Sequence, residues 1–301
     1  MDWLKRMNGA LAYIEDNLTG EIDFNTVAGI ACCSVYHFQR MFSFMVDIPL
    51  SEYIRRRRLT LAAFDLQQSG IKVIDLALKY GYDSPEAFTR AFQRMHGVPP
   101  TLSRQMGISL KSYPRLSFHI TIRGAEEMNY KIIEKDAFSV FGMEQIFSTE
   151  NGENLKGIPE MWNKFQSDGT IERIGKATGR VWTDSSRGIM PVSGVMCYRE
   201  DETGSCSFPY MICGFTPESG LKTREEYQVV DIPKLTWAVF TTETYSPDQT
   251  VAQIQNLWKR IYTEWFPMSS YEPLSGPQFE MYGIAESGLS YCEVWIPVMQ
   301  K

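Results

Sequence analysis

The 301-residue sequence predicts two domains, an all-α domain followed by an α+β domain of two similar strand and helix units. The length is about twice the ~150 residues of an average domain, and either half is long enough to bury a core. One internal repeat, with an offset of 50 residues, has helical periodicity and lies in the first third of the chain. A second repeat, with an offset of 99 residues, lies in the remainder of the chain and falls in segments whose pattern is typical of strands.

The first repeat predicts two copies of a helix, a tight turn and a second helix. Identical residues recur at the 50-residue offset: Ser34 and Ser84, Phe38 and Phe88, Arg40 and Arg90, Phe42 and Phe92, Met45 and Met95, Pro49 and Pro99. We expect the two serines to cap the second helices, with Pro85 at a first helical position, where no N–H is needed. Each second helix has an apolar stripe that packs within the fold, and its polar face is available to a partner outside the fold.

A helix over residues 51–67 is predicted to join the two copies and to end before Gly70. It carries four consecutive arginines, Arg55 to Arg58, which cannot all lie on one face. Charge runs are usually solvated faces. We expect some of these arginines to pair with acids, and Arg55 and Arg56 to reach DNA phosphates.

The remainder predicts eight strands and two helices in duplicate, after a linker over residues 108–127. The first domain is then 1–107 and the second 128–301. The strand-like runs are YKIIEK, FSVFGMEQI, VSGVMCYR, PYMICGF, YQVVDI, TWAVFTTETY, PQFEMYGI and YCEVWIPV, and the helical patterns are Ile158–Phe165 and Val251–Trp265. Ile133 and Phe138 match Ile232 and Trp237 at the offset of 99, which indicates a duplicated unit.

Charge and composition limit the classes of function. Residues 1–110 hold 12 Lys and Arg against 11 Asp and Glu, whereas residues 111–301 hold 18 against 25. A duplex is therefore expected to bind only the first third, and the acidic remainder suits a cationic or neutral partner. No window approaches the ~18 apolar residues of a membrane span, so we expect a cytoplasmic protein without a membrane partner. The six cysteines and three histidines lack metal-ligand spacing, and we expect no metal and no cofactor.

The first third resembles the tandem helix-turn-helix domain of the AraC family of bacterial transcription regulators. The second copy carries the family's signature at Ala77, Gly81, Ser84, Phe88, Arg90, Phe92, Gly97 and Pro99. The resemblance implies that the two recognition helices enter successive major-groove segments of double-stranded DNA. The implied DNA contacts are Tyr36, Gln39 and Arg40 in the first copy and Glu86, Thr89 and Arg90 in the second. Arginine can pair bidentately with guanine, and glutamine with adenine.

The remainder resembles the GyrI-like effector-binding domain over residues 128–298. The blocks that carry the resemblance are DIPKLTWAVFTT, WKRIYTEWFPMSSYEPLSGPQFEMY and CEVWIPV. The resemblance implies two pseudo-symmetric units around a cleft for an organic molecule, often aromatic and cationic. The same fold occurs as a small-molecule hydrolase.

The last strand predicts a carboxylate in the ligand site. Alternation places Glu293 between Tyr291 and Trp295 on one face, opposite a core face. A charge between aromatic rings needs a partner, and an organic cation would supply one. The alternative is an ordinary exposed strand acid, but the family's acidic position aligns with Glu293. Further candidate ligand residues are Tyr198, Tyr245, Tyr282 and Trp265, the last on a helix stripe more typical of a core.

The leading hypothesis is a sequence-specific transcription regulator, expected to be an activator, that senses a small organic effector and couples this to promoter binding or to contact with RNA polymerase. It is not expected to be an enzyme. The alternative is a DNA-tethered hydrolase in which Glu293 activates water.

Overall fold

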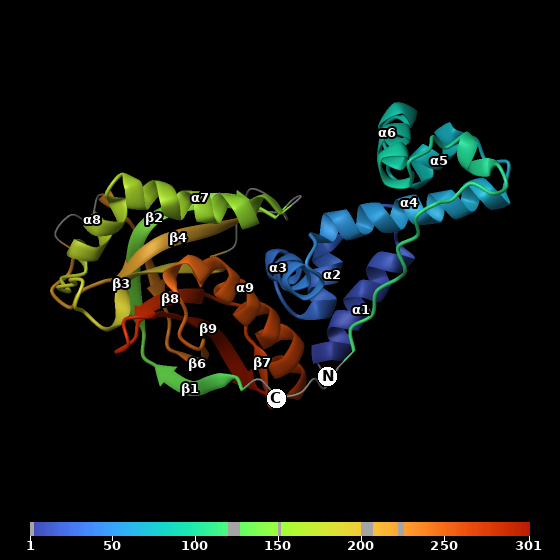
Figure 1. The fold of residues 1–301 in the computed structure, drawn as a ribbon. Coiled ribbons are helices and arrows are strands. Elements are labelled where there is room, and N and C mark those ends of the chain that lie inside the picture. The colour runs from blue at the N-terminus through green and yellow to red at the C-terminus, as the bar shows by residue number, and fades with distance from the viewer. Residues whose placement is uncertain (1–2, 120–126, 150–151, 200–206, 222–225) are drawn as a thin grey trace. The chain divides into compact units, whose positions relative to one another are not determined.

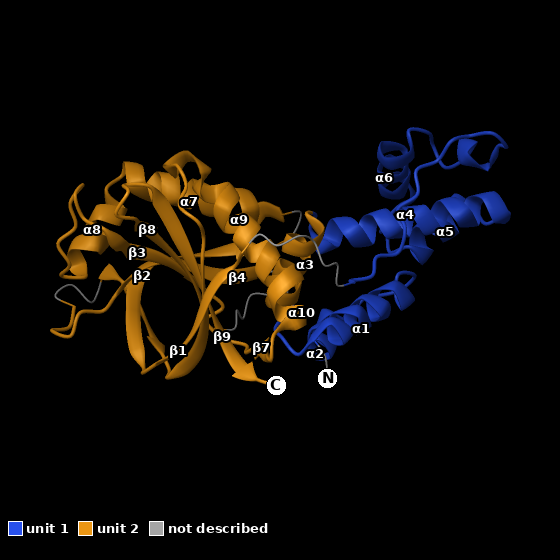
Figure 2. Cartoon of the chain, turned by 60° about the horizontal axis from the view of Figure 1, so that its bottom comes forward, with its two compact units in different colours: residues 1–35, 48–119 blue, residues 36–47, 120–301 orange. Residues whose placement is uncertain are grey.

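The computed structural model describes residues 3–119, 127–149, 152–199, 207–221 and 226–301 (Figure 1). The chain forms two compact units, residues 1–35 with 48–119 (unit 1) and residues 36–47 with 120–301 (unit 2), coloured in Figure 2. Helix α3, Val35–Val46, therefore belongs almost entirely to unit 2, although the sequence predicted it within the N-terminal domain. The sequence boundaries at 107 and 128 stay predictions.

Unit 1 is helical, as predicted. Its elements are α1 (Trp3–Asp16), α2 (Phe24–Ala31), α4 (Leu50–Gln68), α5 (Val73–Lys79), α6 (Pro85–His96) and the 3-10 turn η1 (Leu102–Arg104). Helix α4 extends the predicted helix by one residue at each end. Among the described residues, no helix of either unit is long and apolar enough to cross a bilayer.

The turn chemistry of the second copy is confirmed. The Ser84 hydroxyl accepts a hydrogen bond from the Ala87 N–H at 3.1 Å, and Pro85 begins α6. Gly81 lies in the preceding turn with φ +73°, where a side chain would be strained and would also meet Arg58. These residues fix the geometry that presents α6.

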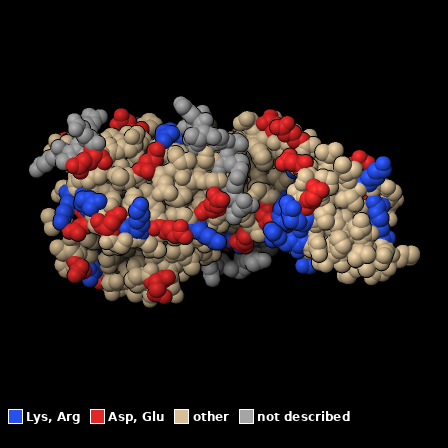
Figure 3. Space-filling view, turned by 90° about the horizontal axis from the view of Figure 1, so that it is seen from above, with Lys and Arg blue, Asp and Glu red and all other residues tan. Residues whose placement is uncertain are grey.

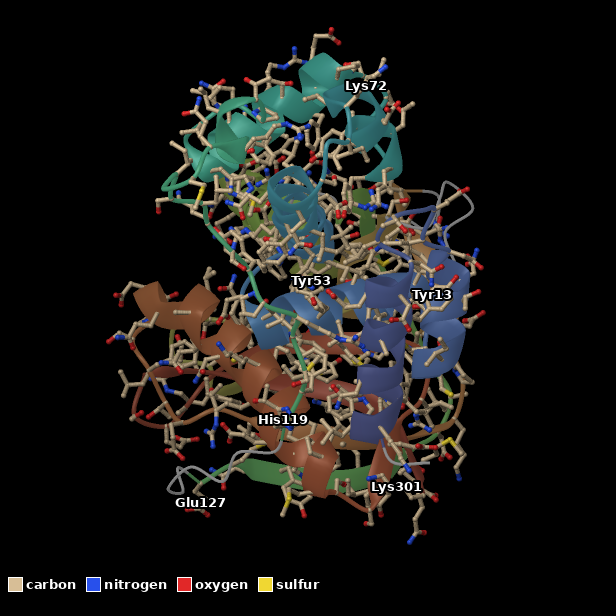
Figure 4. The ribbon with its side chains drawn as sticks, turned by 90° about the vertical axis from the view of Figure 1, so that its right-hand side faces the viewer. Tyr13, Tyr53, Lys72, His119, Glu127 and Lys301 are labelled. Atoms are coloured by element: carbon tan, nitrogen blue, oxygen red, sulfur yellow. The ribbon has the colours of Figure 1, made fainter. Side chains whose placement is uncertain are left out.

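A buried ion pair ties α4 to α1 and to the segment after α6. Arg57 Nη2 lies 2.7 Å from Glu15 Oε2, and the Tyr53 hydroxyl donates to the other Glu15 oxygen at 2.6 Å. Figure 4 labels Tyr53 on α4 and Tyr13 on α1. Arg57 Nη1 also donates to the Tyr113 carbonyl at 2.6 Å, and Leu116 N–H donates to Tyr53 at 3.1 Å. Residues 108–119 of the predicted linker thus belong to unit 1, and residues 120–126 lie outside the described residues.

Unit 2 contains one curled antiparallel sheet with the strand order β1-β6-β9-β8-β3-β4-β2-β5, and β7 pairs with β9. The strands are β1 (Asn129–Lys135), β2 (Phe138–Ser148), β3 (Gly188–Met196), β4 (Ser207–Phe215), β5 (Gln228–Ile232), β6 (Leu235–Thr241), β7 (Tyr271–Pro273), β8 (Gln278–Ile284) and β9 (Ser290–Gln300). All eight predicted strands are present. The short β7 was not predicted, because three residues give no periodicity.

The predicted duplication is also present. The order β1-β2-α7-β3-β4 is repeated as β5-β6-α9-β8-β9, and the halves exchange strands because β1 pairs with β6 and β5 with β2. The helices are α7 (Glu153–Ser167), α8 (Thr170–Ala177), α9 (Thr250–Arg260), the π-turn η5 (Ile261–Trp265) and α10 (Phe266–Met268). The short α8 was not predicted, and the predicted helix over 251–265 divides at the π-turn.

Side chains alternate between two apolar layers across this sheet. Tyr210 and Ile212 pack on one face with residues of α7 and α8, whereas Met211, Trp237 and Phe279 pack on the other. The register Glu280↔Val294 and Met281↔Glu293 assigns the residues of β8 and β9 to these faces. Glu280 therefore lies on the helix-covered face and Glu293 on the opposite one.

Candidate functional site

A cavity of about 380 Å³ lies in unit 2 on the helix-covered face of the sheet. Helices α7 and α9, one from each half, supply Trp162 and Trp258 to its walls, and β8 supplies Glu280 and Tyr282. Helix α3 supplies Arg40. The remaining wall is largely apolar, so the site suits an organic molecule with few polar groups.

Glu280 is the carboxylate of this cavity, and it is 8% exposed. One oxygen accepts the Trp258 indole N–H at 2.7 Å and Arg40 Nη2 at 3.0 Å. The other oxygen lies 3.4 Å from the hydroxyls of Tyr210 and Tyr282. Burial and then the charge of Glu280 raise the pKa of both tyrosines well above the ordinary value, so they remain donors.

Arg40 is the cation that Glu280 pairs with, and it is 6% exposed. Its Nη1 donates to Gln278 Oε1 at 2.9 Å, beside the bond from Nη2 to Glu280. Its Cζ lies 4.0 Å from the ring centre of Trp258 and 5.1 Å from that of Phe44. The guanidinium is therefore held by two acceptors and by the face of an indole.

The neighbours of Arg40 on α3 are buried in unit 2 as well. The Tyr36 ring stacks on Phe208 with centroids 3.7 Å apart, and the Gln39 side-chain oxygen accepts a hydrogen bond from the Thr149 hydroxyl. His37 Nε2 lies 2.9 Å from the Tyr262 hydroxyl. Burial and the nearby charge of Arg40 lower the pKa of His37 to about 3, so the ring is neutral.

The structure brings two predicted ligand residues to the cavity, Tyr245 and Tyr282. Glu293 does not line it. On the opposite face of the sheet, Glu293 accepts the Trp295 indole N–H at 2.8 Å and lies 3.6 Å from Lys131 Nζ. Its part in ligand binding stays a prediction.

Tyr198 and Trp265 also lie away from the cavity lining. The Tyr198 hydroxyl donates to Glu144 at 2.5 Å, and Trp265 packs edge-on against Phe240 at 4.9 Å. Sequence reasoning missed Glu280, although β8 carried a signal. Gln278, Glu280 and Tyr282 are polar at every second position of an apolar strand, which marks one face of it.

The predicted DNA contacts fall into two groups. On α6, Glu86 and Arg90 are exposed and Thr89 is half-buried. The second group, Tyr36, Gln39 and Arg40 of α3, is at most 6% exposed. The α6 residues are thus at least partly open to solvent, whereas the α3 residues are buried within unit 2. Base reading by either group stays a prediction.

The predicted phosphate contacts on α4 are partly exposed. Arg55 Nε donates to Glu52 at 2.8 Å and Arg56 Nε donates to the same carboxylate at 2.5 Å. The face shown in Figure 3 carries basic and acidic side chains interspersed. An arginine that reaches phosphate would exchange this intrahelical pair for the DNA backbone.

Comparison with known families covers most of the chain. Residues 131–298 match the Cass2 family, described as integron-associated effector binding protein, and residues 27–106 match a helix-turn-helix domain family. Over 94 residues the chain is 43% identical to the HTH-type transcriptional activator AarP of Providencia stuartii, covering 31% of this chain and 70% of AarP. It is 34% identical over 105 residues to the right origin-binding protein of Escherichia coli K12. That alignment covers 35% of this chain and 36% of the relative, about a third of each.

Two solved structures have similar parts. The integron cassette protein Cass2 from the mobile metagenome of Vibrio cholerae aligns with a TM-score of 0.37 and 18% identity, over 56% of this chain and 95% of that one. An AraC-type DNA-binding regulator from Chromobacterium violaceum aligns with a TM-score of 0.31 and 21% identity, over 33% of this chain and 88% of that one.

Proposed function

Because the chain belongs to the AraC-type transcription regulators and carries a Cass2-type effector-binding domain, we propose that an organic cation bound at Glu280 controls its binding to promoter DNA. The observation that carries the proposal is the buried carboxylate in an aromatic cavity. A buried charge is stable only when it is paired. Glu280 is paired with Arg40 in this structure, so an effector that takes the place of Arg40 must bring a positive charge of its own. The rings of Trp258 and Trp162 favour a flat apolar group beside that charge, with cation–π attraction of ~0.5–2 kcal/mol.

The proposed output is activation of transcription. AarP is named a transcriptional activator, and residues 27–106 of this chain match a helix-turn-helix domain family. We extend that role to this chain, with RNA polymerase as the partner and the cytoplasm as the place where both meet DNA.

The chain is proposed to be a sensor and not an enzyme. A general base needs an oxygen free to take a proton from water. Both oxygens of Glu280 already face donors, namely Arg40, Trp258, Tyr210 and Tyr282. Glu293, the base of the hydrolase hypothesis, lies 3.6 Å from Lys131 Nζ and accepts the Trp295 indole N–H, and these contacts do not favour its use as a base.

The test compares phenylguanidinium with phenylurea, which has nearly the same shape and no charge. Intrinsic tryptophan fluorescence of the full chain should give a preference for the cation of roughly tenfold or more. Glu280→Gln should abolish that preference, whereas the matched Glu293→Gln should retain it. Equal affinity of wild type for the two compounds, or loss of preference only in Glu293→Gln, would contradict the proposal.

A further inference from the structure

We infer that the effector and helix α3 compete for one site, so that a planar cation releases α3 for DNA by replacing Arg40. This inference rests on the proposed function and adds both the shape of the cation and the means of regulation. Four observations within unit 2 carry it.

The site around Arg40 selects a planar cation with two neighbouring N–H donors. Gln278 Oε1 and Glu280 Oε1 accept from the two terminal nitrogens at 2.9 and 3.0 Å. Two acceptors side by side match the fork of a guanidinium or amidinium, whereas an ammonium is a compact point charge. The Trp258 face at 4.0 Å completes a slot for a flat group.

The cavity continues beyond the guanidinium and is lined there by apolar side chains, including Ile158, Ile171 and Ile254. The arginine fills only the polar end of the site. A free guanidinium or amidinium with an aryl or alkyl group can occupy the polar end and the apolar part together. It gains apolar burial that Arg40 does not have.

Each predicted base-reading side chain of α3 has a partner in unit 2. Tyr36 is stacked on Phe208, the Gln39 amide oxygen accepts from Thr149, and Arg40 is paired with Glu280. A side chain cannot bind a base edge and the cleft at once. The state with α3 in the cleft therefore excludes major-groove reading by α3, and any ligand that displaces α3 favours DNA binding by mass action.

Two of the contacts that α3 makes outside the cavity lining make the inference testable. Thr149 donates to Gln39, and Lys259 Nζ lies 2.5 Å from Asp47 Oδ2. Neither Thr149 nor Lys259 lines the cavity or belongs to the predicted DNA contacts. The double substitution Thr149→Val with Lys259→Glu therefore loosens α3 and leaves both binding surfaces in place.

The experiment uses the full chain, a duplex selected from random sequence by the wild type, and phenylguanidinium. In wild type the compound should tighten DNA binding, measured by fluorescence anisotropy, and should raise amide exchange of residues 36–47. The loosened variant should bind both DNA and phenylguanidinium roughly three- to thirtyfold more tightly without the other ligand. The matched control Lys176→Glu reverses an exposed charge on α8, where Lys176 pairs with Glu172, and should behave as wild type.

The outcomes separate this inference from the proposed function. If phenylguanidinium binds with its charge preference while exchange of 36–47 and DNA affinity stay constant, competition is overturned and the proposed function remains. If the loosened variant gains no affinity for DNA, competition is overturned as well. If neither wild type nor the loosened variant binds any cation in preference to phenylurea, the proposed function fails, and displacement by an effector fails with it.

Discussion

Lowering the pH from 7.5 to 5.5 should release α3 through a single side chain, His37. The ring lies in unit 2 with Nε2 at 2.9 Å from the Tyr262 hydroxyl and at 3.0 Å from the Gln278 amide nitrogen. Arg40, one turn along α3, is the charged group that acts on it, and its carboxylate partner is Glu280. An imidazolium in this position would face a guanidinium in a buried site.

The direction and the size of the pH effect on the docking of α3 follow from the two pKa values of His37. In the cleft the pKa is about 3, and in a released, hydrated helix it returns to about 6.5. Above pH 6.5 the ring is neutral in both states, so docking does not depend on pH. Below pH 6.5 the His37 ring is protonated in the released state and stays neutral in the docked state. Docking therefore weakens by ~1.4 kcal/mol per pH unit until about pH 3. At pH 5.5 the ratio of docked to released helix should therefore fall about tenfold.

Amide exchange of residues 36–47, corrected for the intrinsic effect of pH, measures this ratio directly. His37→Gln should remove the pH dependence because glutamine does not titrate in this range. His96 is a matched control: burial also lowers its pKa, but it lies on α6 in unit 1, so His96→Gln should keep the response of α3. A wild-type protection of 36–47 that is the same at both pH values would refute the reasoning, as would an unchanged slope in His37→Gln.

Four further predictions concern the scaffold and the DNA contacts. Gly142→Ala should destabilise unit 2 by more than ~3 kcal/mol in urea unfolding, because its Cβ would lie 2.0 Å from a backbone carbonyl oxygen of β4 that cannot move aside. Glu15→Ala should lower the stability of unit 1 by ~3–5 kcal/mol in the same measurement, since it leaves the buried Arg57 without its carboxylate. An equal loss in Glu15→Gln, which keeps the shape of the side chain, would show that the charge is responsible. In binding selections, Arg90→Ala should relax preference at one base position at a cost of ~1–3 kcal/mol. Arg56→Ala should instead weaken all sequences alike and reduce the salt slope by about one.

Much of the fold was predictable because local and repeated signals agree. Ser84, Pro85 and Gly81 define a cap, a first turn and a tight turn within five residues, and the structure has all three. The 99-residue offset predicted paired halves, and the register places Ile133 opposite Trp237 and Phe138 opposite Ile232. Short elements such as α8, with eight residues, and β7, with three, escape prediction because so few residues define a period weakly or not at all.

The candidate ligand cavity was harder to predict because alternation gives two faces and does not say which one the helices cover. Cys292, Val294 and Ile296 of the last strand are buried on one face, as expected, and Glu293 on the other face is buried as well, at 7% exposure. The sequence interpretation took that face as plain core and the face of Glu293 as the site. The helices in fact cover the Val294 face, and the neighbouring strand presents Glu280 there. Which carboxylate meets the cavity depends on the pairing of β8 with β9, and pairing is a property of the assembled sheet.

The polar face of α3 presents the same difficulty in another form. The periodicity placed Tyr36, Gln39 and Arg40 outside the apolar stripe of the helix. What these side chains contact therefore had to be inferred from their chemistry. DNA bases and the cleft of unit 2 offer similar chemistry. A guanine edge presents two acceptors to an arginine fork, as Gln278 and Glu280 do. In the proposed competition one guanidinium serves both. Any substitution at Arg40 that alters the base it reads is then expected also to alter how firmly α3 is held, so that operator choice and effector response do not vary independently at this position.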